Sequence, residues 1–373
     1  MSNIQNIDQH IVINVAERIE RLIKDARQHI NRIVDITEVI TKYEIGHVII
    51  EVVQEGEDRA RYGKQLLKGV SEILTERLGE GWSVDTLKKC RKFYQIYSAN
   101  KIGATLSPQL TIEDSGYSVA PIQKTATSQK LDSAYPFTLS WSHYVVLMRM
   151  ESADERRFYE IEAKNQNWSV RQLQRQYNSS LYERLALSKD KEAILRLAQE
   201  GQTINKPDDI IKNPLTLEFL GLKPDASYSE TKLENAIIDK LQQFLLELGK
   251  GFLFEARQKR FTFEEENFFV DLVFYNRLLQ CYVLIDLKVD KLAHQDLGQM
   301  QMYVNYYDRY VKQDFEKPTI GILLCKSKRD SLVELTLPKE ANIYAAEYAL
   351  YLPDKKELQQ KLKEWTEEFE EDN

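Results

Sequence analysis

The stretch "CYVLIDLKVDKL" at residues 281–292 decides the fold of the second half of this chain. Its aliphatic run from Val283 to Val289 is typical of a strand that is buried on both faces. Asp286 and Lys288 nevertheless lie in the middle of that run. Because an unpaired charge is costly in an apolar sheet, we expect a partner for these two side chains nearby.

The segments around this strand predict an α/β domain at residues 229–353. A periodic helix of about 18 residues in "TKLENAIIDKLQQFLLELGKG" (231–251) precedes two β-rich runs, "FLFEARQKRFTF" (252–263) and "NFFVDLVFY" (267–275). A helix at about 293–311 leads to a further strand in "PTIGILLC" (318–325), and "NIYAAEYALYLP" (342–353) adds another. Sequential strands favour a meander, and a strand reached through a helix can lie parallel to its neighbour, so we expect an αβββαβ order and a mixed central sheet.

The register of the central hairpin places two acids side by side. If Asn276 pairs with Cys281 across "NRLLQ" (276–280), Asp271 lies opposite Asp286, with Cβ atoms about 5 Å apart. Lys288 lies on the same face as Asp286, roughly 7 Å further along the strand at about 3.3 Å per residue. Two such carboxylates repel each other unless one is protonated or a cation neutralises both.

A divalent metal ion is a suitable cation for this pair. Oxygen ligands favour Mg²⁺ or Mn²⁺, and the backbone carbonyl of Leu287 offers one more such ligand beside Asp271 and Asp286. These ions are commonly completed by a substrate phosphate, which predicts phosphodiester hydrolysis, with Lys288 positioning a water and stabilising the developing charge. The alternative is that Asp286 and Lys288 merely neutralise each other at a sheet edge.

Two helices flanking the strands contribute further candidates. Glu234 lies at the border of the core-facing stripe of its helix and can approach the metal, although a capping box between Thr231 and Glu234 explains the same residue without function. Gln299 and Tyr303 are one helical turn apart and share a face, where they can contact a phosphate or the catalytic water. Packing is the alternative for the tyrosines of this helix.

The first half of the chain is helical, in a domain expected at residues 1–100. One helix ends near Leu78, a turn spans Gly79 to Gly81, and Ser83 caps a second helix, as in a helix-turn-helix unit. This second helix carries a basic cluster that either contacts DNA phosphates or is a solvated face of a packed helix. The cluster consists of Lys88, Lys89, Arg91 and Lys92.

A weak internal repeat divides the remaining N-terminal half. "WSVDTL" (82–87) returns as "WSVRQL" (168–173), and the basic residues of the second copy are Arg171 and Arg175. Two such units either bind one long duplex together or pack against each other, and packing is favoured. We expect a flexible linker at 101–135, a second helical segment at 136–200, a proline-punctuated connector at 201–228 and an acidic C-terminal helix at 354–373.

Composition limits the class of protein. The 373 residues include 43% hydrophobic and 29% charged residues, which suits a globular protein of several domains. With 51 basic and 58 acidic residues the net charge is −7, so a nucleic-acid surface must be local. The first β-rich run offers such a row in Arg257, Lys259 and Arg260.

The cysteines and the N-terminus bear on where the protein acts. Cys90, Cys281 and Cys325 are far apart in sequence, which predicts no disulfide framework and suits a reducing compartment. No signal-peptide pattern and no apolar run of about 18 residues stands in the sequence. We therefore expect a cytoplasmic protein without a membrane partner.

The helix glutamate, the "VD" and "DLK" strands and the Q-x-x-x-Y helix together resemble the PD-(D/E)XK nuclease superfamily, whose fold is that of restriction endonucleases. Further stretches, among them "LSWSHY" (139–144), "LEFLGL" (217–222) and "DLVFYNRLLQCYVLIDLK" (271–288), resemble the bacterial YhcG-like family of PDDEXK nuclease proteins. In that family a helical N-terminal domain precedes the nuclease domain. The resemblance covers roughly residues 12–352.

The resemblance implies roles for individual residues. Asp271 takes the place of the first acid of the motif, Asp286 that of the (D/E), and Lys288 that of the lysine. Glu234 corresponds to the helix acid, and Gln299 begins the Q-x-x-x-Y pair that Tyr303 completes. This chain departs from the pattern in two places, because family members often have Glu at the position of Asp286 and Gly at the position of Asp290.

These observations predict a Mg²⁺- or Mn²⁺-dependent DNA endonuclease. The resemblance implies work in DNA processing, restriction or phage defence, with branched DNA as a possible substrate and a protein of a restriction or defence system as a possible partner. Cutting both strands of a duplex favours a homodimer. The alternative is a non-catalytic DNA-binding or assembly subunit that retains the nuclease fold.

Overall fold

The computed structural model describes residues 9–54, 59–98, 136–187, 191–223, 228–338 and 341–371. The chain forms two compact units, residues 1–156 and 157–373. The linker expected at 101–135 lies outside the described residues. The second helical segment, expected at 136–200, is helical but does not form one body, because the boundary between the two units falls within it.

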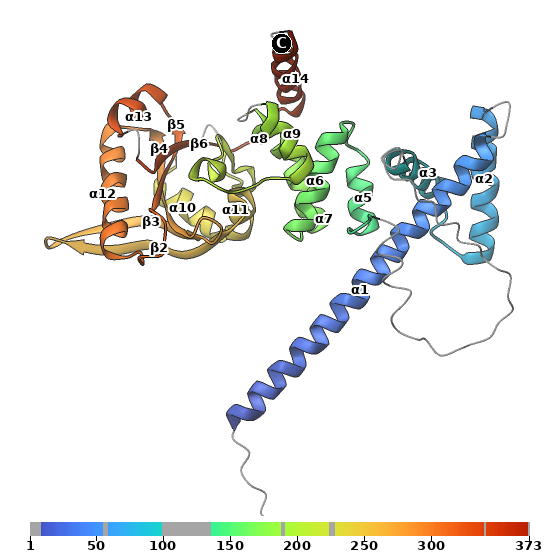
Figure 1. Ribbon diagram of the computed structural model, residues 1–373, viewed down its shortest axis with the longest axis horizontal. Coiled ribbons are helices and arrows are strands. Elements are labelled where there is room, and N and C mark those ends of the chain that lie inside the picture. Colours follow the sequence, from blue (N-terminus) through green and yellow to red (C-terminus); the bar gives the residue numbers. More distant parts are fainter. Residues whose placement is uncertain are drawn as a thin grey trace, which may run out of the picture. The chain divides into compact units, whose positions relative to one another are not determined.

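The first unit is helical, as expected for residues 1–100. Its helices are α1 (Gln9–Gln54), α2 (Arg59–Leu78), α3 (Val84–Ser98) and α5 (Trp141–Leu147), shown in Figure 1. Gly79 and Gly81 have φ angles of +86° and +109°, which glycine adopts readily. The hydroxyl of Ser83 accepts a hydrogen bond from the backbone N–H of Thr86 at 3.2 Å. The helix, glycine turn and capped helix are therefore confirmed as local structure.

The core of this unit is the contact between α1 and α3. Phe93 of α3 is fully buried and lies edge-on to Tyr43 of α1, with ring centroids 5.9 Å apart. Gly46 stands at the closest approach, where an added Cβ atom would lie 2.2 Å from the carbonyl oxygen of Cys90. Only glycine allows the two helices to approach this closely.

The second unit begins with short helices. These are the remainder of α6 (Ala153–Asn165), α7 (Val170–Asn178), α8 (Leu181–Ala186) and α9 (Lys191–Glu200). Ser169 caps α7 and accepts a hydrogen bond from the backbone N–H of Gln172 at 3.3 Å. The two "WSV" stretches therefore share one local structure, in which the serine starts a helix.

A six-stranded mixed sheet forms the centre of the second unit (Figure 1). The strand order is β1-β6-β5-β4-β3-β2, where β2, β3 and β4 are antiparallel and β4, β5, β6 and β1 are parallel. This confirms the predicted meander and the parallel strands after it. The strands are β1 (Leu215–Thr216), β2 (Phe252–Phe263), β3 (Glu266–Asn276), β4 (Cys281–Lys291), β5 (Ile320–Ser327) and β6 (Ile343–Ala349).

Helices cover both faces of this sheet. Helices α10 (Glu230–Asp239) and α11 (Leu241–Leu248) pack on one face, where Leu233 and Phe244 are fully buried. Helix α12 (His294–Tyr310) packs on the other face through Leu297 and Met300, with α13 (Asp330–Thr336) beside it. The C-terminal helix α14 spans Lys355–Glu371, as expected. None of the described helices is long and apolar enough to cross a membrane.

Three details of the second unit differ from the predictions. The single helix expected in 231–251 is two helices, because Lys240 leaves the helical conformation with φ −117° and ψ 30°. The connector expected at 201–228 is part of the domain, since its residues Leu215–Thr216 form the edge strand β1 beside β6. Helix α13 was not predicted. The apolar spacing runs on across Lys240, so periodicity does not reveal the break.

A buried ion-pair network joins α7 and α8 to the sheet domain. Glu247 is fully buried and lies 2.5 Å from Arg175 and 2.8 Å from Arg184. Arg175 also pairs with Glu218 at 3.0 Å. Burial alone would raise the pKa of Glu247, but the positive charges of Arg184, Arg175 and Lys212 lower it to about 2. Arg175 therefore stabilises the packing of α7 within the second unit, while the packing of the two repeat units against each other stays a prediction.

Candidate active site

The central hairpin has the predicted register. The pairs run from Asn276 with Cys281 to Leu272 with Ile285. At the next step the ladder stops, and the side chain of Asp271 takes over: its Oδ2 accepts a hydrogen bond from the backbone N–H of Leu287 at 2.7 Å. Asp271 is thereby fixed to β4 beside Asp286.

Asp286 and Lys288 form an ion pair within the sheet. Asp286 is only 3% exposed, and the Nζ atom of Lys288 lies 2.8 Å from its Oδ2. The mutual neutralisation in the alternative interpretation is therefore present, but the sheet edge is wrong, because β4 lies between β3 and β5. Two further acids, Glu230 and Asp296, lie 3.8 and 4.0 Å from the same ammonium group.

The pKa values of this pair reflect burial and charge. Burial and then the nearby Asp271 carboxylate raise the pKa of Asp286 to about 6, although Lys288 acts in the opposite direction. Burial would lower the pKa of Lys288, but the attraction of Asp286 outweighs it, so this pKa is raised. Lys288 therefore stays cationic at neutral pH.

Glu234 is buried and faces the site. Its helix begins with Ser229, whose hydroxyl accepts a hydrogen bond from the backbone N–H of Lys232 at 3.2 Å, so the capping box proposed between Thr231 and Glu234 is wrong. Glu234 is 4% exposed, and its Oε1 lies 3.1 Å from Nε of Arg257 on β2.

Gln258 of β2 is a site residue that was not predicted. Its Nε2 donates to Oε2 of Glu234 at 2.5 Å and to Oδ1 of Asp271 at 2.9 Å. Its φ of +46° is unusual for a residue other than glycine. Counting across the hairpin of β2 and β3 could have found it. The pairs Arg257 with Leu272 and Lys259 with Val270 place Gln258 opposite Asp271.

Helix α12 places Gln299 and Tyr303 together, as their spacing predicts. Nε2 of Gln299 donates a hydrogen bond to the hydroxyl of Tyr303. The Tyr303 ring is buried and lies edge-on to Phe261, with centroids 5.6 Å apart. The alternative role in packing applies to two other tyrosines of this helix. Tyr307 is also buried, and Tyr306 stacks on Phe261.

The basic residues of β2 lie on the exposed edge strand of the sheet. Arg257 contacts Glu234, as described above, and donates to Oδ1 of Asn235 at 3.1 Å. Lys259 lies 3.7 Å from Glu255, and Nε of Arg260 donates to Asn267 at 2.9 Å. This row is available at the surface near the site.

The basic residues of α3 divide into two groups. Lys88 and Lys92 are exposed, and Arg91 is partly buried. Lys89 pairs with Asp85 at 2.6 Å. The buried residues of this helix, including Cys90 and Phe93, face the core of the first unit. Lys88 and Lys92 are therefore the members of this cluster most open to a partner.

The carboxylates fit a divalent cation by chemistry. Oxygens of Glu234 and Asp271 converge on a single donor, the Nε2 of Gln258, and Asp286 lies beside them. Carboxylate oxygens are the ligands that Mg²⁺ and Mn²⁺ prefer. Across the described residues, however, no three His, Cys, Asp or Glu side chains already form a metal-binding group. The carboxylate oxygens that could bind the ion are therefore present, but they are not yet arranged as a coordination shell.

A mixed sheet flanked by helices, with acids on α10, β3 and β4 and a lysine two residues after the last acid, defines a restriction-endonuclease-like domain of the PDDEXK nuclease class. Comparison with protein families agrees: the YhcG PDDEXK nuclease domain matches residues 208–363, and the DUF1016 N-terminal domain matches residues 18–184. The chain is 39% identical over 349 residues to the protein named "Putative nuclease YhcG" of Escherichia coli (strain K12), covering 93% of this chain and 92% of that one. The chain belongs to the YhcG-like family of PDDEXK nuclease proteins.

Two solved structures show limited similarity. A repair endonuclease from Pyrococcus abyssi is 20% identical, with 35% of this chain and 50% of that chain covered and a TM-score of 0.24. The EndoMS–dsDNA2 complex is 17% identical, with 35% and 48% covered and a TM-score of 0.25. At these TM-scores neither adds to the assignment.

Asp290, where the family pattern often has Gly, is exposed, at a point where the pairing of β4 with β5 shifts register.

Proposed function

We propose that the second unit is a DNA endonuclease that depends on a divalent metal ion, Mg²⁺ or Mn²⁺. The observation that carries this proposal is that Glu234 and Asp271 both accept from Nε2 of Gln258, next to the ion pair of the buried Asp286 with Lys288. A bound divalent cation supplies positive charge that stabilises the phosphate as negative charge develops on it. Glu234, Asp271, Asp286 and the Leu287 carbonyl are the proposed ligands.

The remaining side chains have distinct proposed roles. Lys288 places a permanent positive charge beside the reacting phosphate, and Asp286 keeps that lysine protonated by raising its pKa. Tyr303 is held by the core, so its hydroxyl fixes the amide of Gln299 at the site. Gln299 can then orient the phosphate or the attacking water.

DNA is the proposed partner. The exposed edge strand β2 presents Arg257, Lys259 and Arg260 beside the site, and such residues contact backbone phosphates. On the first unit we propose Lys88 and Lys92 of α3, with Lys89 and Arg91 beside them, as a second phosphate-binding surface. The alternative function, a DNA-binding or assembly subunit without catalysis, uses the same surfaces.

A cleavage assay separates these two functions. The full chain is incubated with linear, supercoiled and branched DNA, each with Mg²⁺, with Mn²⁺ and with a chelator. We expect cleavage that appears only with a divalent ion, because the carboxylates of Glu234, Asp271 and Asp286 repel a phosphate unless a cation lies between them. Binding without cleavage under all conditions would favour the non-catalytic subunit. The form of DNA that is cut fastest, linear, supercoiled or branched, would help to distinguish the proposed roles in DNA processing, restriction and phage defence.

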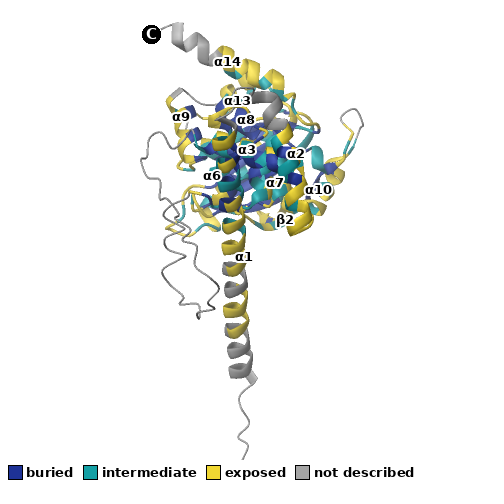
Figure 2. Ribbon diagram, turned by 90° about the vertical axis from the view of Figure 1, so that its right-hand side faces the viewer, coloured by how far each residue is buried: buried dark blue, intermediate teal, exposed yellow. Residues whose placement is uncertain are grey.

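The homodimer also remains a proposal, supported by an apolar stripe on α1. Ile19, Ile23, Ile30 and Ile33 follow one another at spacings of four, seven and three residues, and all are between 43% and 59% exposed. Figure 2 shows the exposed residues of this stretch in yellow. Such spacing places apolar residues along one seam of a coiled coil, which a second copy of the chain would cover.

Light scattering on the full chain tests the dimer. We expect twice the chain mass for the wild type and a shift toward the single-chain mass for Ile30→Glu, because a charge in the seam opposes pairing. Thr41→Glu, on the same helix but outside this stripe, is the control. A wild-type chain that is monomeric at high concentration, or a dimer unaffected by Ile30→Glu, would contradict this proposal.

A further inference from the structure

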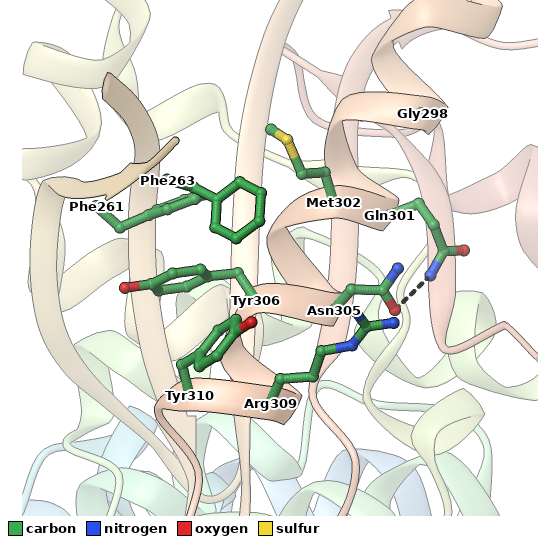
Figure 3. A pocket seen from close by; sticks show the side chains of 9 residues that line it. All are labelled: Phe261, Phe263, Gly298, Gln301, Met302, Asn305, Tyr306, Arg309 and Tyr310. Carbon is green, nitrogen blue, oxygen red and sulfur yellow. Dashed lines mark hydrogen bonds between the residues drawn. The ribbon is translucent and has the colours of Figure 1, made fainter. Parts of the chain in front are cut away.

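A hollow of about 340 Å³ lies between α12 and the end of β2 (Figure 3). Its walls are aromatic: Phe261 and Tyr306 lie face to face with ring centroids 4.0 Å apart, and Tyr310 lies 5.3 Å from Tyr306. Phe263 and Tyr310 are exposed, although large aromatic side chains are usually covered. The volume lies within the range of about 300–1,000 Å³ that is typical of sites for small ligands.

Polar groups line one side of the hollow. Nε2 of Gln301 donates to Oδ1 of Asn305 at 3.3 Å, and Figure 3 shows both amides next to Arg309, to the right of the aromatic rings. The Oε1 atom of Gln301 is buried and has no hydrogen-bond partner within the described part of the chain. Arg309 also lines the hollow and is exposed. A suitable ligand therefore combines a flat apolar face with hydrogen-bonding groups at its edge.

The hollow adjoins the candidate active site. Phe261, which forms its wall, also contacts Tyr303, the residue that holds Gln299. On α12 the lining residues Gly298 and Met302 directly precede Gln299 and Tyr303. A ligand in the hollow would thus lie one side chain away from the residues proposed to act on the phosphate.

We propose that this hollow binds a nucleobase of an unpaired nucleotide next to the phosphate that is cut. Every nucleobase has a flat π-face that stacks on aromatic rings and donors or acceptors along its edge. A base within a duplex already stacks on its neighbours, so only an unpaired or extruded base can enter. The Gln301 and Asn305 amides meet the base edge, and Arg309 faces the adjoining backbone. This inference rests on the proposed nuclease function, whose substrate class it narrows.

Gly298 offers a direct way to block the hollow. A Cβ atom added there meets nothing within 4 Å, so the first atom of a larger side chain has open space. Gly298→Trp fills the hollow, and Gly298→Ala is the matched control. Tyr310→Ala removes an aromatic wall, with Tyr351→Ala as its control, because Tyr310 and Tyr351 are 63% and 62% exposed and Tyr351 is not among the lining residues.

Binding is measured by fluorescence anisotropy of a labelled single-stranded oligothymidylate, with chelator present so that nothing is cut. We expect Gly298→Trp and Tyr310→Ala to weaken binding between about fivefold and a hundredfold, the range for one lost stacking contact. The two controls should bind as the wild type does. In the wild type, one abasic nucleotide at the position that enters the hollow should weaken binding to a similar degree, with little further loss in Gly298→Trp.

Three results would overturn the inference. These are unchanged binding by both hollow variants that keep the wild-type melting temperature, equal binding of abasic and intact strands at every position, and equal loss with the controls. Because cleavage plays no part in this experiment, its failure leaves the nuclease proposal standing. A failure of the cleavage assay would likewise leave the binding result interpretable.

Discussion

Replacing Lys288 by alanine is expected to slow DNA cleavage by about 10²- to 10³-fold, as the loss of one charge-stabilising group typically does. The ammonium group lies 2.8 Å from Asp286, the buried acid of β4. Asp271→Asn is expected to have an effect of at least this size, because it removes a proposed ligand while the amide oxygen can still accept from Leu287. Initial cleavage rates at saturating Mg²⁺ measure both effects.

DNA binding and folding serve as controls for these variants. Lys206→Ala, a lysine in the same unit whose only pairing within the described residues is to Asp208 at 3.8 Å, should cut at the wild-type rate. Both site variants should still bind DNA, since the phosphate contacts proposed on β2 are unchanged. Cleavage that survives both substitutions would show that another site does the chemistry.

Replacing Glu247 by glutamine is expected to destabilise the second unit by about 3–5 kcal/mol, the range for breaking a buried ion pair from one side. Arg175, Arg184 and Lys212 would then keep buried positive charges without their shared carboxylate. Urea unfolding of the full chain measures the change in the free energy of unfolding. Glu218→Gln, which affects only the partly exposed pairing with Arg175, should cost much less.

The same carboxylate gives the stability a pH dependence. The pKa of Glu247 is lowered to about 2 in the folded chain, compared with its usual 4.5. A lowered carboxyl pKa stabilises the fold above the unfolded-state value, and this contribution is lost as pH falls from about 4.5 toward 2. The wild type should therefore lose more stability over that interval than Glu247→Gln. Parallel losses in the two proteins would contradict the pKa assignment.

The position of the acids could be predicted because hairpins obey a simple register. Asn276 and Cys281 bound a short loop, and counting from them brings Asp271 to Asp286. The same arithmetic across the preceding hairpin reaches Gln258, but a neutral amide does not attract notice in a strand rich in charges. Its importance comes from contacts with Glu234 and Asp271, which only the tertiary structure brings together.

Other features depend on contacts between residues far apart in sequence. Strand β1 has two residues and forms only because β6 offers a free edge, so no local pattern marks it. Arg175 looks like a surface cation in its helix, yet it is drawn into the core by Glu247, 72 positions later. The break at Lys240 is hidden because apolar residues continue at helical spacing on both sides.

Metal binding without DNA tests the proposed site most directly. Mn²⁺ is titrated into the full chain and the heat of binding is recorded for the wild type, Asp271→Asn and Lys288→Ala. We expect the wild type and Lys288→Ala to bind the ion, and Asp271→Asn to bind it more than about tenfold more weakly, because ligand oxygens set the affinity and the lysine does not coordinate. Equal Mn²⁺ affinity in the wild type and Asp271→Asn would contradict a metal site built on Asp271.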